Sequence, residues 1–270
     1  TDTIILAAID FDAKHVELIS IPRDTYVPIA GENKKDKINS CLYYACKQDR
    51  GQFDVAMETV SGLLGDVPVN YYAAIDMEFV MKMVDDMGGL WFDVDVPVRV
   101  RSRVSIADTG YQKLNGVQVL DYARHRNTPM GDIDRVARQQ RLMMAVFDQL
   151  KDLDQIKNIP KFCQNFNDHV YTNLNLKQIS ALALFAKDLN KPDISMRSIE
   201  GYFLDIDDIS YWGVDQLARR ELAKELFGVD IPVMPNDVPR ITYKKYSKNS
   251  DDRKTNKKDD TASGDKDSEK

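Results

Sequence analysis

Apolar residues recur along the chain at two spacings, one typical of strands and the other of helices. Alternating and β-branched residues predict a hairpin of two strands, 3–11 and 15–21, with its turn at 12–14. Spacings of three and four predict amphipathic helices, with further short strands between them. The expected helices are 53–64, 77–87, 132–150, 175–189 and 212–227, and the further strands are 71–75, 90–98 and 194–199. Strands interleaved with helices indicate an α/β fold, an α-β-α sandwich around a central mixed sheet.

Other segments lack this periodicity. Residues 31–36 and 99–110 are polar, and we expect them to be loops, although the alternation of Arg99, Arg101 and Arg103 also fits a basic strand face. Asp93 and Asp95 alternate with Phe92 and Val94, so we expect both carboxylates either to be solvated or to protect the edge of a sheet. After Tyr243 the chain is almost entirely Lys, Asp, Ser, Thr and Asn. We therefore expect one domain over 1–240 and a disordered, charged tail over 241–270.

Net charge and cysteine content restrict the classes of ligand that the protein is expected to bind. The formal net charge is −6, whereas a nucleic-acid-binding domain needs a basic surface, so no nucleic-acid partner is expected. Local positive charge within an acidic protein indicates a small anionic ligand instead. The cysteines, Cys41, Cys46 and Cys163, show no metal-binding spacing, and we expect free thiols.

The sequence contains neither a signal peptide nor an apolar run of the ~20 residues that a membrane helix needs. It begins with Thr-Asp-Thr-Ile-Ile-Leu, inside the first expected strand, which is typical of a fragment. An anchor upstream of the sequence is compatible with this start.

The most unusual stretch runs from Asp121 to Arg141 and holds five arginines in 21 residues. If 122–126 is extended, Arg124 and Arg126 point to the same side. Pro129 and Gly131 then break the chain, and a helix begins near Asp132 or Asp134. Upstream, Asn115 is positioned to cap a short helix that leads into this stretch.

The helix after this break carries its own polar cluster. Arg135, Arg138 and Gln139 share one face and prolong the apolar stripe that continues through Leu142 and Val146. Arginines on a helix usually form a solvated surface, but this placement favours a cleft or the interior. Arg141 lies off the stripe, and we expect it at the surface. Converging guanidinium groups beside a helix N-terminus suit phosphate or pyrophosphate.

A second charged group is expected at one end of the predicted hairpin. Asp2 precedes the first strand, and Arg23 and Asp24 follow the second, so a hairpin brings all three together. Two carboxylates beside an arginine are a reasonable site for a hard cation and a phosphate. Turn capping by Asp24 and surface solvation of Asp2 are the simpler alternatives.

Several motifs occur in a fixed order along the chain. They are Asp2-Thr-Ile, Ser20-Ile-Pro-Arg23-Asp24-Thr-Tyr, Lys37-Ile-Asn39, Met87-Gly-Gly, Tyr122-Ala-Arg124-His-Arg126, Gly131-Asp132, Arg135 and Arg138-Gln139. Together they resemble the LytR-CpsA-Psr family, most specifically over residues 2–150 and more weakly over 170–200. The family consists of bacterial cell-envelope phosphotransferases that move a glycopolymer from undecaprenyl pyrophosphate to peptidoglycan and leave a phosphodiester link.

The resemblance implies a role for each matching residue. Asp2 matches the aspartate that binds the divalent cation, Mg²⁺ or Mn²⁺, and Asp24 matches the neighbouring acid. Arg23, Arg124 and Arg126 match arginines that contact the pyrophosphate. Further matches are Arg135 and Gln139 in the same catalytic cluster, with Arg138, Asp132, Lys37 and Asn39 as substrate-binding residues.

The family pattern also includes segments that this sequence lacks. An upstream strand carries another acid and a basic residue, and a transmembrane helix precedes it. The resemblance therefore implies a protein at the extracellular face of the cell membrane, anchored by a helix absent from this sequence. An apolar groove for the polyprenyl chain is also implied, with candidates Leu42, Val60, Leu64, Phe79, Met83, Met143 and Phe147.

Three functions fit these residues. The first is transfer of a teichoic acid or other cell-wall or capsular polysaccharide to peptidoglycan. The second is hydrolysis of polyprenyl pyrophosphate by water, which the same arginines would support. The third is binding of polyprenyl-phosphate-linked glycans without catalysis. The sequence favours the first function through the resemblance and does not separate it from the second by residue chemistry.

Overall fold

The computed structural model describes residues 2–128, 132–165 and 167–233. The expected tail at 241–270 lies outside these residues, as do Pro129, Gly131 and the side chain of Asp132. Within the described ranges, no helix combines the length and the apolar character that crossing a bilayer requires.

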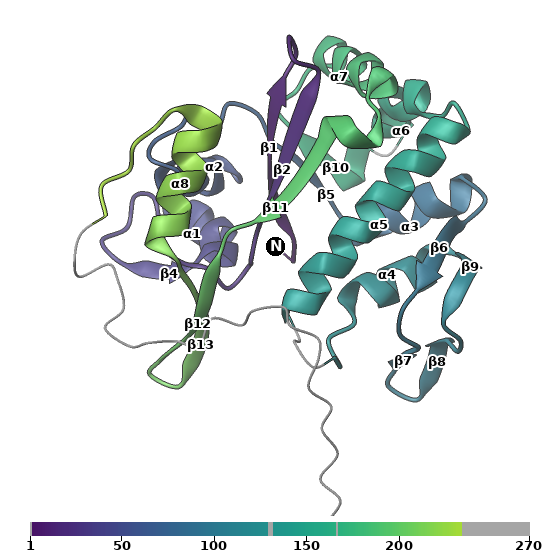
Figure 1. Ribbon diagram of the computed structural model, residues 1–270, viewed down its shortest axis with the longest axis horizontal. Coiled ribbons are helices and arrows are strands. Elements are labelled where there is room, and N and C mark those ends of the chain that lie inside the picture. The colour runs from purple at the N-terminus through teal and green to yellow at the C-terminus, as the bar shows by residue number, and fades with distance from the viewer. Residues whose placement is uncertain (1, 129–131, 166, 234–270) are drawn as a thin grey trace, which may run out of the picture. The chain divides into compact units, whose positions relative to one another are not determined.

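A three-stranded mixed sheet, in the order β1-β2-β11, lies at the centre of the fold (Figure 1). β1 (Ile4–Asp10) and β2 (His15–Ile21) form the expected antiparallel hairpin, and β11 (Ile194–Ser198) pairs with β2 in parallel. Ile4 is the partner of Ile21 in the hairpin register. Residues just before β1 therefore lie beside residues just after β2.

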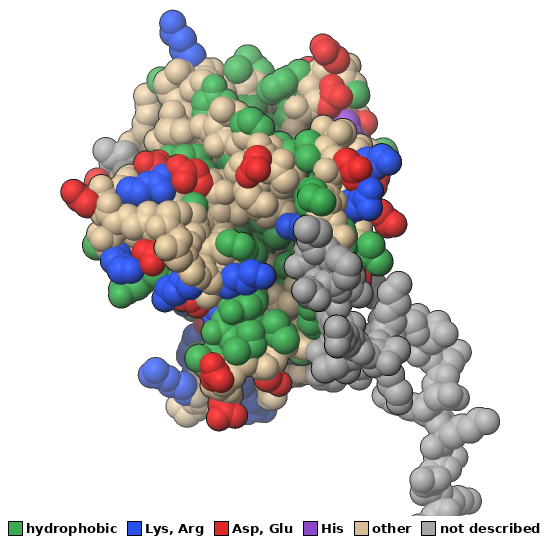
Figure 2. Space-filling model, turned by 90° about the vertical axis from the view of Figure 1, so that its left-hand side faces the viewer, with side chains coloured by type: hydrophobic (Ala, Val, Ile, Leu, Met, Phe, Trp, Pro, Cys, Tyr) green, Lys and Arg blue, Asp and Glu red, His purple; other side chains and the backbone are tan. Residues whose placement is uncertain are grey.

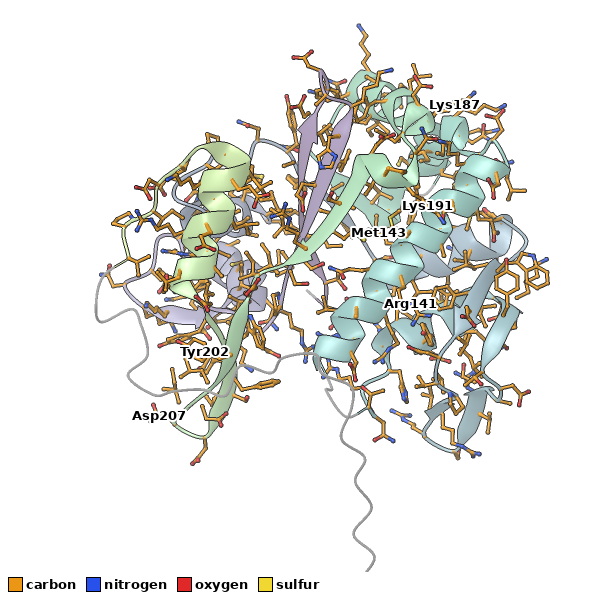
Figure 3. The ribbon with its side chains drawn as sticks, viewed as in Figure 1. Arg141, Met143, Lys187, Lys191, Tyr202 and Asp207 are labelled. Carbon is orange, nitrogen blue, oxygen red and sulfur yellow. The ribbon has the colours of Figure 1, made fainter. Side chains whose placement is uncertain are left out.

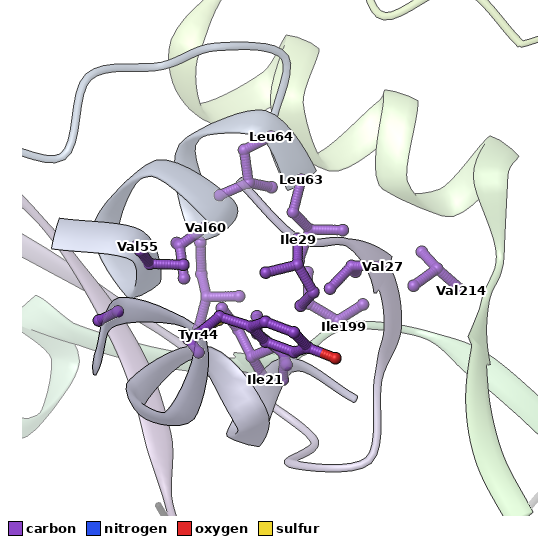
Figure 4. Close-up of a cluster of buried hydrophobic side chains, with 14 residues drawn as sticks. Ile21, Val27, Ile29, Tyr44, Val55, Val60, Leu63, Leu64, Ile199 and Val214 are labelled. Atoms are coloured by element: carbon purple, nitrogen blue, oxygen red, sulfur yellow. The ribbon is translucent and has the colours of Figure 1, made fainter. Parts of the chain in front are cut away.

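Helices cover both faces of this sheet, which confirms the α-β-α sandwich (Figure 1). Side chains of β2 alternate between the faces. Ile19 and Ile21 join a buried cluster with residues of α1 (Cys41–Lys47) and α2 (Asp54–Leu63), and α8 (Gln216–Phe227) packs against the same cluster (Figure 4).

The other face of the sheet meets α5 (Asp132–Asp152). The side-chain amide of Gln140 on this helix donates to Ser20 Oγ over 2.9 Å and to the Arg197 carbonyl over 3.2 Å. Nearer the turn of the β1–β2 hairpin, Phe185 of α7 (Leu176–Asp188) contacts Phe11, with ring centroids 5.0 Å apart. The helix that carries the expected arginine face is thus fixed directly to the central sheet.

Two-stranded sheets and shorter helices complete the described part of the chain. The strand pairs are β3 (Tyr26–Pro28) with β4 (Lys35–Lys37), β5 (Ala73–Ile75) with β10 (Val170–Thr172), β6 (Leu90–Val94) with β9 (Gly110–Leu114), β7 (Val98–Val100) with β8 (Arg103–Ile106), and β12 (Gly201–Ile206) with β13 (Ile209–Val214). The helices are α3 (Met77–Asp86), α4 (Gly116–Arg124), α6 (Ile159–Asn165) and 3₁₀ turns at Ile38–Ser40, Ile156–Asn158, Asn167–His169 and Lys191–Asp193. All three cysteines are free thiols, as expected.

The residues expected at two helix ends, Asn115 and Gly228, are confirmed as caps. Asn115 caps α4 through a capping box, in which its side chain accepts from the Gln118 amide and the Gln118 side chain accepts from the Asn115 amide. α8 ends at Gly228, whose φ of 69° is the left-handed conformation that glycine adopts readily.

The expected strand at 122–126 is wrong, because Tyr122 to Arg124 form the last turn of α4. The capping box starts this helix, and its buried face, which includes Val119 and Tyr122, holds it in place. The chain becomes extended only at His125, with φ −62° and ψ 130°. Arg124 and Arg126 therefore lie on either side of a helix end and share no strand face.

Three other expected assignments are partly wrong, because strands form where a helix or loop is expected. β13 occupies the start of the expected helix at 212–227, and Asp215 caps α8 after it. The expected loop at 99–110 contains most of the β7–β8 hairpin, and the expected loop at 31–36 includes part of β4. In each case pairing with a neighbouring strand of a hairpin decides the structure, and local polarity does not reveal it.

The Asp95 carboxylate, which is expected to be solvated or to protect a sheet edge, is hydrogen-bonded to two side chains. Its carboxylate accepts from the Tyr122 hydroxyl over 2.6 Å and from Arg141 over 2.7 Å. Burial opposes ionisation of Asp95, yet these two partners bring its pKa below the ordinary value. Burial and the bond to Asp95 raise the pKa of Tyr122 strongly. Arg141, which extends from α5 (Figure 3), is half exposed, and this network ties α5 to α4 and to the segment after β6.

Replacing Tyr122 with Phe keeps the ring and removes the hydroxyl that donates to Asp95. We expect Tyr122→Phe to lower the free energy of unfolding by about 1 kcal/mol, because a partly buried hydrogen bond to a charged group is lost. Urea unfolding measures this change. Tyr111→Phe is the control, since that ring is 72% exposed and should unfold like the wild type. Equal effects of the two substitutions would contradict the role of the Tyr122 hydroxyl.

Candidate active site

The segment that follows β2 is held rigidly by backbone hydrogen bonds. The Arg23 carbonyl accepts from the Asn39 amide over 3.1 Å, and the Thr25 carbonyl accepts from the Ile38 amide over 2.9 Å. On the opposite side, the Asp24 carbonyl accepts from the Trp212 amide over 2.8 Å. Asn39 thus contributes to this site through its backbone amide, which positions Arg23. A substrate-binding role for its side chain stays a prediction.

Asp2 lies between two arginines. Its carboxylate is 3.3 Å from a terminal nitrogen of Arg23 and 3.7 Å from one of Arg124. The hairpin register explains the first contact, and the end of α4 supplies the second. Asp2, Arg23 and Arg124 therefore come together from the residues before β1, the segment after β2 and the end of α4.

Asp24 lies between two cations in the same way. It is 3.5 Å from Arg23 Nε and 3.0 Å from Lys37 Nζ. The Lys37 ammonium also lies 5.3 Å from the centre of the Tyr211 ring. Lys37 and Arg23 thus border one carboxylate, beside an aromatic side chain from β13.

Residues of α5 fix the chain that carries Arg124 and Arg126. Arg138 donates to the His125 carbonyl, and Gln139 donates to the Ala123 carbonyl over 3.2 Å. Arg138 is almost fully buried, and its guanidinium lies 5.9 Å from the Tyr122 ring centre. Arg138 accordingly positions the end of α4. The expected helix start at 132 is confirmed, while a role for the Asp132 side chain stays a prediction.

Two clefts border these residues and meet at Arg23 and Val136. The first, the β1–α5 cleft, is lined by Asp2, Thr3, Ile4, Ile5, Ser20, Ile21, Arg23, Arg135, Val136, Gln139 and Gln140. It has about 10 Å³ of open space, roughly the room of one water molecule, and is therefore closed in this conformation.

The second, the hairpin cleft, is larger, at about 260 Å³. Its lining residues come from the segment after β2, from β4, from Arg126 and α5, and from the β12–β13 hairpin. They are Pro22, Arg23, Asp24, Lys37, Arg126, Val136, Phe203, Ser210, Tyr211 and Trp212.

Charge and chemistry of the two clefts suit a phosphorylated ligand. Four cationic side chains, those of Arg23, Lys37, Arg126 and Arg135, line them against the two carboxylates of Asp2 and Asp24. Arg135 is almost fully buried on α5. Arg124 lines neither cleft and reaches the site through its ion pair with Asp2.

The residues expected to form an apolar groove for the polyprenyl chain do not line either cleft. Val60 and Leu64 pack in the core cluster of Figure 4, Phe79 is buried, and none of the seven candidates lines either cleft. The apolar side chains beside the arginines are Ile4, Ile5, Ile21 and Val136.

Phe203, Ser210, Tyr211 and Trp212 line the hairpin cleft and are absent from the sequence prediction. A signal was present, because Tyr202-Phe-Leu-Asp-Ile and Ile209-Ser-Tyr-Trp flank the dipeptide Asp207-Asp208. Both aspartates have positive φ, 50° and 62°, as a two-residue hairpin turn of type I′ requires.

Two carboxylates could hold a cation here. Asp2 and Asp24 offer hard oxygen ligands, and Mg²⁺ commonly takes one or two carboxylates and completes its shell with water and substrate phosphate. Among the described residues, no group of three or more His, Cys, Asp or Glu side chains could hold a metal. The two carboxylates are nevertheless the type of oxygen ligand that Mg²⁺ prefers, and substrate oxygens and water would have to supply the remaining ligands.

His125 stands between Arg124 and Arg126 and is partly buried. Burial and the positive charge of Arg138 lower its pKa below the ordinary value. The imidazole consequently stays neutral at neutral pH, which keeps another positive charge away from the arginine cluster.

Comparisons with known proteins agree with these features. The family model LytR_cpsA_psr matches residues 1–228. The teichoic acid transferase TagU of Enterococcus faecalis, named as a polyisoprenyl-teichoic acid–peptidoglycan enzyme, is 27% identical over 84% of this chain and 72% of its own. The crystal structure of Bacillus subtilis TagV superposes with a TM-score of 0.70 at 28% identity, over 83% of this chain and 87% of its own. A structure of TagT bound to LIIa-WTA gives a TM-score of 0.67 at 25% identity and covers 84% of both chains.

The lowered pKa of His125 makes stability depend on pH. As the pH falls through about 6.5, the unfolded chain binds a proton at this histidine before the folded chain does, so stability falls. We expect the wild type to lose more unfolding free energy between pH 7.5 and pH 5 than His125→Gln. Urea unfolding at both pH values measures the difference, and identical losses in the two proteins would contradict it.

Proposed function

The chain belongs to the LytR-CpsA-Psr family, and we propose that it transfers a glycopolymer from a polyprenyl pyrophosphate-linked precursor to peptidoglycan through a phosphodiester bond. The observation that carries the proposal is the ion-paired group of Arg23, Asp2 and Arg124 beside two clefts that Arg126 and Arg135 also line. The names of the relatives support a teichoic acid as the polymer.

Pyrophosphate chemistry explains why these side chains would serve the transfer. Phosphoryl transfer depends mainly on positioning and on stabilising charge at the phosphate oxygens. Arg23 borders both clefts, so it can contact both phosphates, with Arg126 on one side and Arg135 on the other. Arginine binds phosphate oxygens through paired N–H donors, which also fixes the orientation of the phosphorus.

The proposed reaction exchanges one oxygen–phosphorus bond for another. A hydroxyl of a peptidoglycan sugar attacks the phosphorus that carries the glycan, and the bond from that phosphorus to the bridging oxygen breaks. Polyprenyl monophosphate leaves, and the glycan keeps its phosphate as a diester. Asp24 lines the larger cleft and is the carboxylate we assign to accept the hydroxyl proton.

A divalent cation, Mg²⁺ or Mn²⁺, would neutralise charge on the phosphates when bound. Asp2 and Asp24 are the residues that would hold it. The polyprenyl chain would begin among Ile4, Ile5 and Ile21, so β1 and α5 must separate to admit it. We further propose that the protein works at the extracellular face of the membrane, anchored by a segment outside this sequence.

Product analysis tests the transfer. The protein is incubated with polyprenyl pyrophosphate-linked glycan and Mg²⁺, with and without an uncrosslinked peptidoglycan oligosaccharide. Glycan attached to the oligosaccharide through a phosphodiester supports the proposal. Release of phosphorylated glycan at the same rate without the acceptor indicates hydrolysis instead, and binding without any turnover indicates a carrier protein.

Loss of either central arginine should reduce turnover. We expect Arg23→Ala and Arg124→Ala each to lower kcat by about 10²-fold or more, because a donor to the developing phosphate charge is removed. Steady-state transfer rates measure this. Arg99→Ala, at an exposed position on β7, is the matched control and should retain the wild-type rate. Near-normal kcat in both site variants would refute the assignment.

The carboxylate of Asp2 should strengthen the binding of Mg²⁺ and weaken the binding of a metal-free anion. We expect chelation with EDTA to abolish turnover, and Asp2→Asn to raise the Mg²⁺ concentration for half-maximal rate about tenfold or more. Without any divalent cation, the same variant should bind inorganic pyrophosphate more tightly, because a negative charge leaves Arg23 and Arg124.

Asp108→Asn, an exposed position, is the control for both measurements. Titration calorimetry with pyrophosphate supplies the binding constants. Unchanged Mg²⁺ dependence in Asp2→Asn would remove this residue from the cation site.

A further inference from the structure

The β12–β13 hairpin presents two aromatic rings to the hairpin cleft. Phe203 and Trp212 are direct partners in the strand register and so lie on one face. Their ring centroids are 5.6 Å apart, with planes at 88°. The indole is fixed by a hydrogen bond from its Nε1 to the Ile199 carbonyl over 3.1 Å. Phe203 is 56% exposed, which leaves much of its ring open to the cleft and to solvent.

This aromatic wall is tied directly to the charged residues. The Trp212 amide donates to the Asp24 carbonyl, and a single parallel bridge joins Thr25 to Trp212. Tyr211 packs on Tyr26 with ring centroids 4.7 Å apart. The hairpin therefore keeps its rings at a fixed distance from Asp24 and its neighbours.

The cleft consequently has a charged part and an aromatic part. Arg23, Lys37 and Arg126 supply the first, and Phe203 and Trp212 supply the second. Polar groups continue along the same strand face, because Ser210 and its register partner Asp205 lie two residues further from the charged part. Figure 2, which faces the left-hand side of Figure 1, shows hydrophobic side chains gathered in the lower part of that side, with basic side chains next to them.

We propose that the hairpin cleft is a sugar subsite, in which the first sugar of a pyrophosphate-linked glycan packs on Phe203 and Trp212. This inference rests on the proposed function and specifies where the glycan part of the substrate binds. The phosphates occupy the cationic part, and the sugar attached to them must then lie within one bond of it. A sugar ring has an apolar C–H face that suits an aromatic ring and hydroxyl groups that suit Ser210 and Asp205.

The lining excludes the lipid part of the substrate from this cleft. A polyprenyl chain here would lie beside three cations and the Asp24 carboxylate, and would leave their charges partly desolvated. The open space of about 260 Å³ is also slightly below the roughly 300–1,000 Å³ of pockets that enclose a whole small molecule. It suits the phosphate and adjoining sugar, with the rest of the polymer in solvent.

Binding of matched soluble probes tests the subsite separately from catalysis. The probes are geranyl pyrophosphate and the same molecule with one N-acetylglucosamine on its terminal phosphate, titrated calorimetrically into the full chain. We expect the wild type to bind the sugar-bearing probe more tightly. Phe203→Ala should weaken that probe about five- to tenfold by loss of apolar contact, and should leave the sugar-free probe unchanged.

Two further variants make the result specific. Phe203→Tyr keeps the ring and should keep the wild-type preference for the sugar-bearing probe. Ile209→Ala, also on the hairpin and 48% exposed but on its opposite face, should behave like the wild type. If Ile209→Ala also loses the preference for the sugar-bearing probe, the loss in Phe203→Ala reflects a disturbed hairpin fold, and the sugar subsite is overturned.

The outcomes also separate this inference from the proposed function. If the wild type binds the sugar-free probe, and the sugar adds nothing or Phe203→Ala weakens both probes equally, the subsite is wrong and the phosphate site stands. If the wild type binds neither probe, the proposed function fails and the subsite fails with it. If Phe203→Ala leaves both probes unaffected, the exposed ring serves another contact, such as a protein partner, and the subsite is overturned.

Discussion

Repulsion between like charges is the constraint on which this site depends. Arg23 and Arg124 come from segments 100 residues apart in sequence, and both approach one carboxylate, Asp2. Without such a carboxylate, converging guanidinium groups would repel one another unless a ligand were present. Asp24 does the same for Arg23 and Lys37. The resting site is thus a set of cations held by two carboxylates, and phosphate oxygens can replace these carboxylates as partners of the cations.

The surrounding fold keeps these cations in place by using neighbouring polar groups structurally. Arg138 and Gln139 bond carbonyls at the end of α4, and Gln140 bonds the central sheet. Arg126, Arg135, Gln139 and Gln140 line a cleft, whereas Arg138 lines neither cleft and positions the end of α4. This division explains why a dense motif can contain both ligand-binding and positioning residues at adjacent sequence positions.

Local patterns predict the parts of the fold that depend on local interactions. The β1–β2 hairpin, the Asn115 cap and the start of α5 follow from alternation, capping chemistry and helical spacing. The hairpin alone is enough to place Asp2 beside Arg23. Tyr122 to Arg124 are different, because both a strand and a helix fit so short a segment, and the burial of Val119 and Tyr122 on one helix face decides. The contact of Trp212 with Asp24 and the contacts of Asp95 with Tyr122 and Arg141 are made between distant segments, which no window of local sequence contains.

The β12–β13 hairpin gives the molecule a modular character. Its tip is a two-residue turn, and its outer side chains make no part of the buried cluster in Figure 4. Its base is joined, through Trp212 and Tyr211, to the segment that carries Asp24. Substitutions toward the tip, at Ser210 for example, would consequently change the lining of the hairpin cleft and leave the contacts at the base in place. One short ribbon of the chain thereby shapes part of the cleft independently of the residues around Asp24.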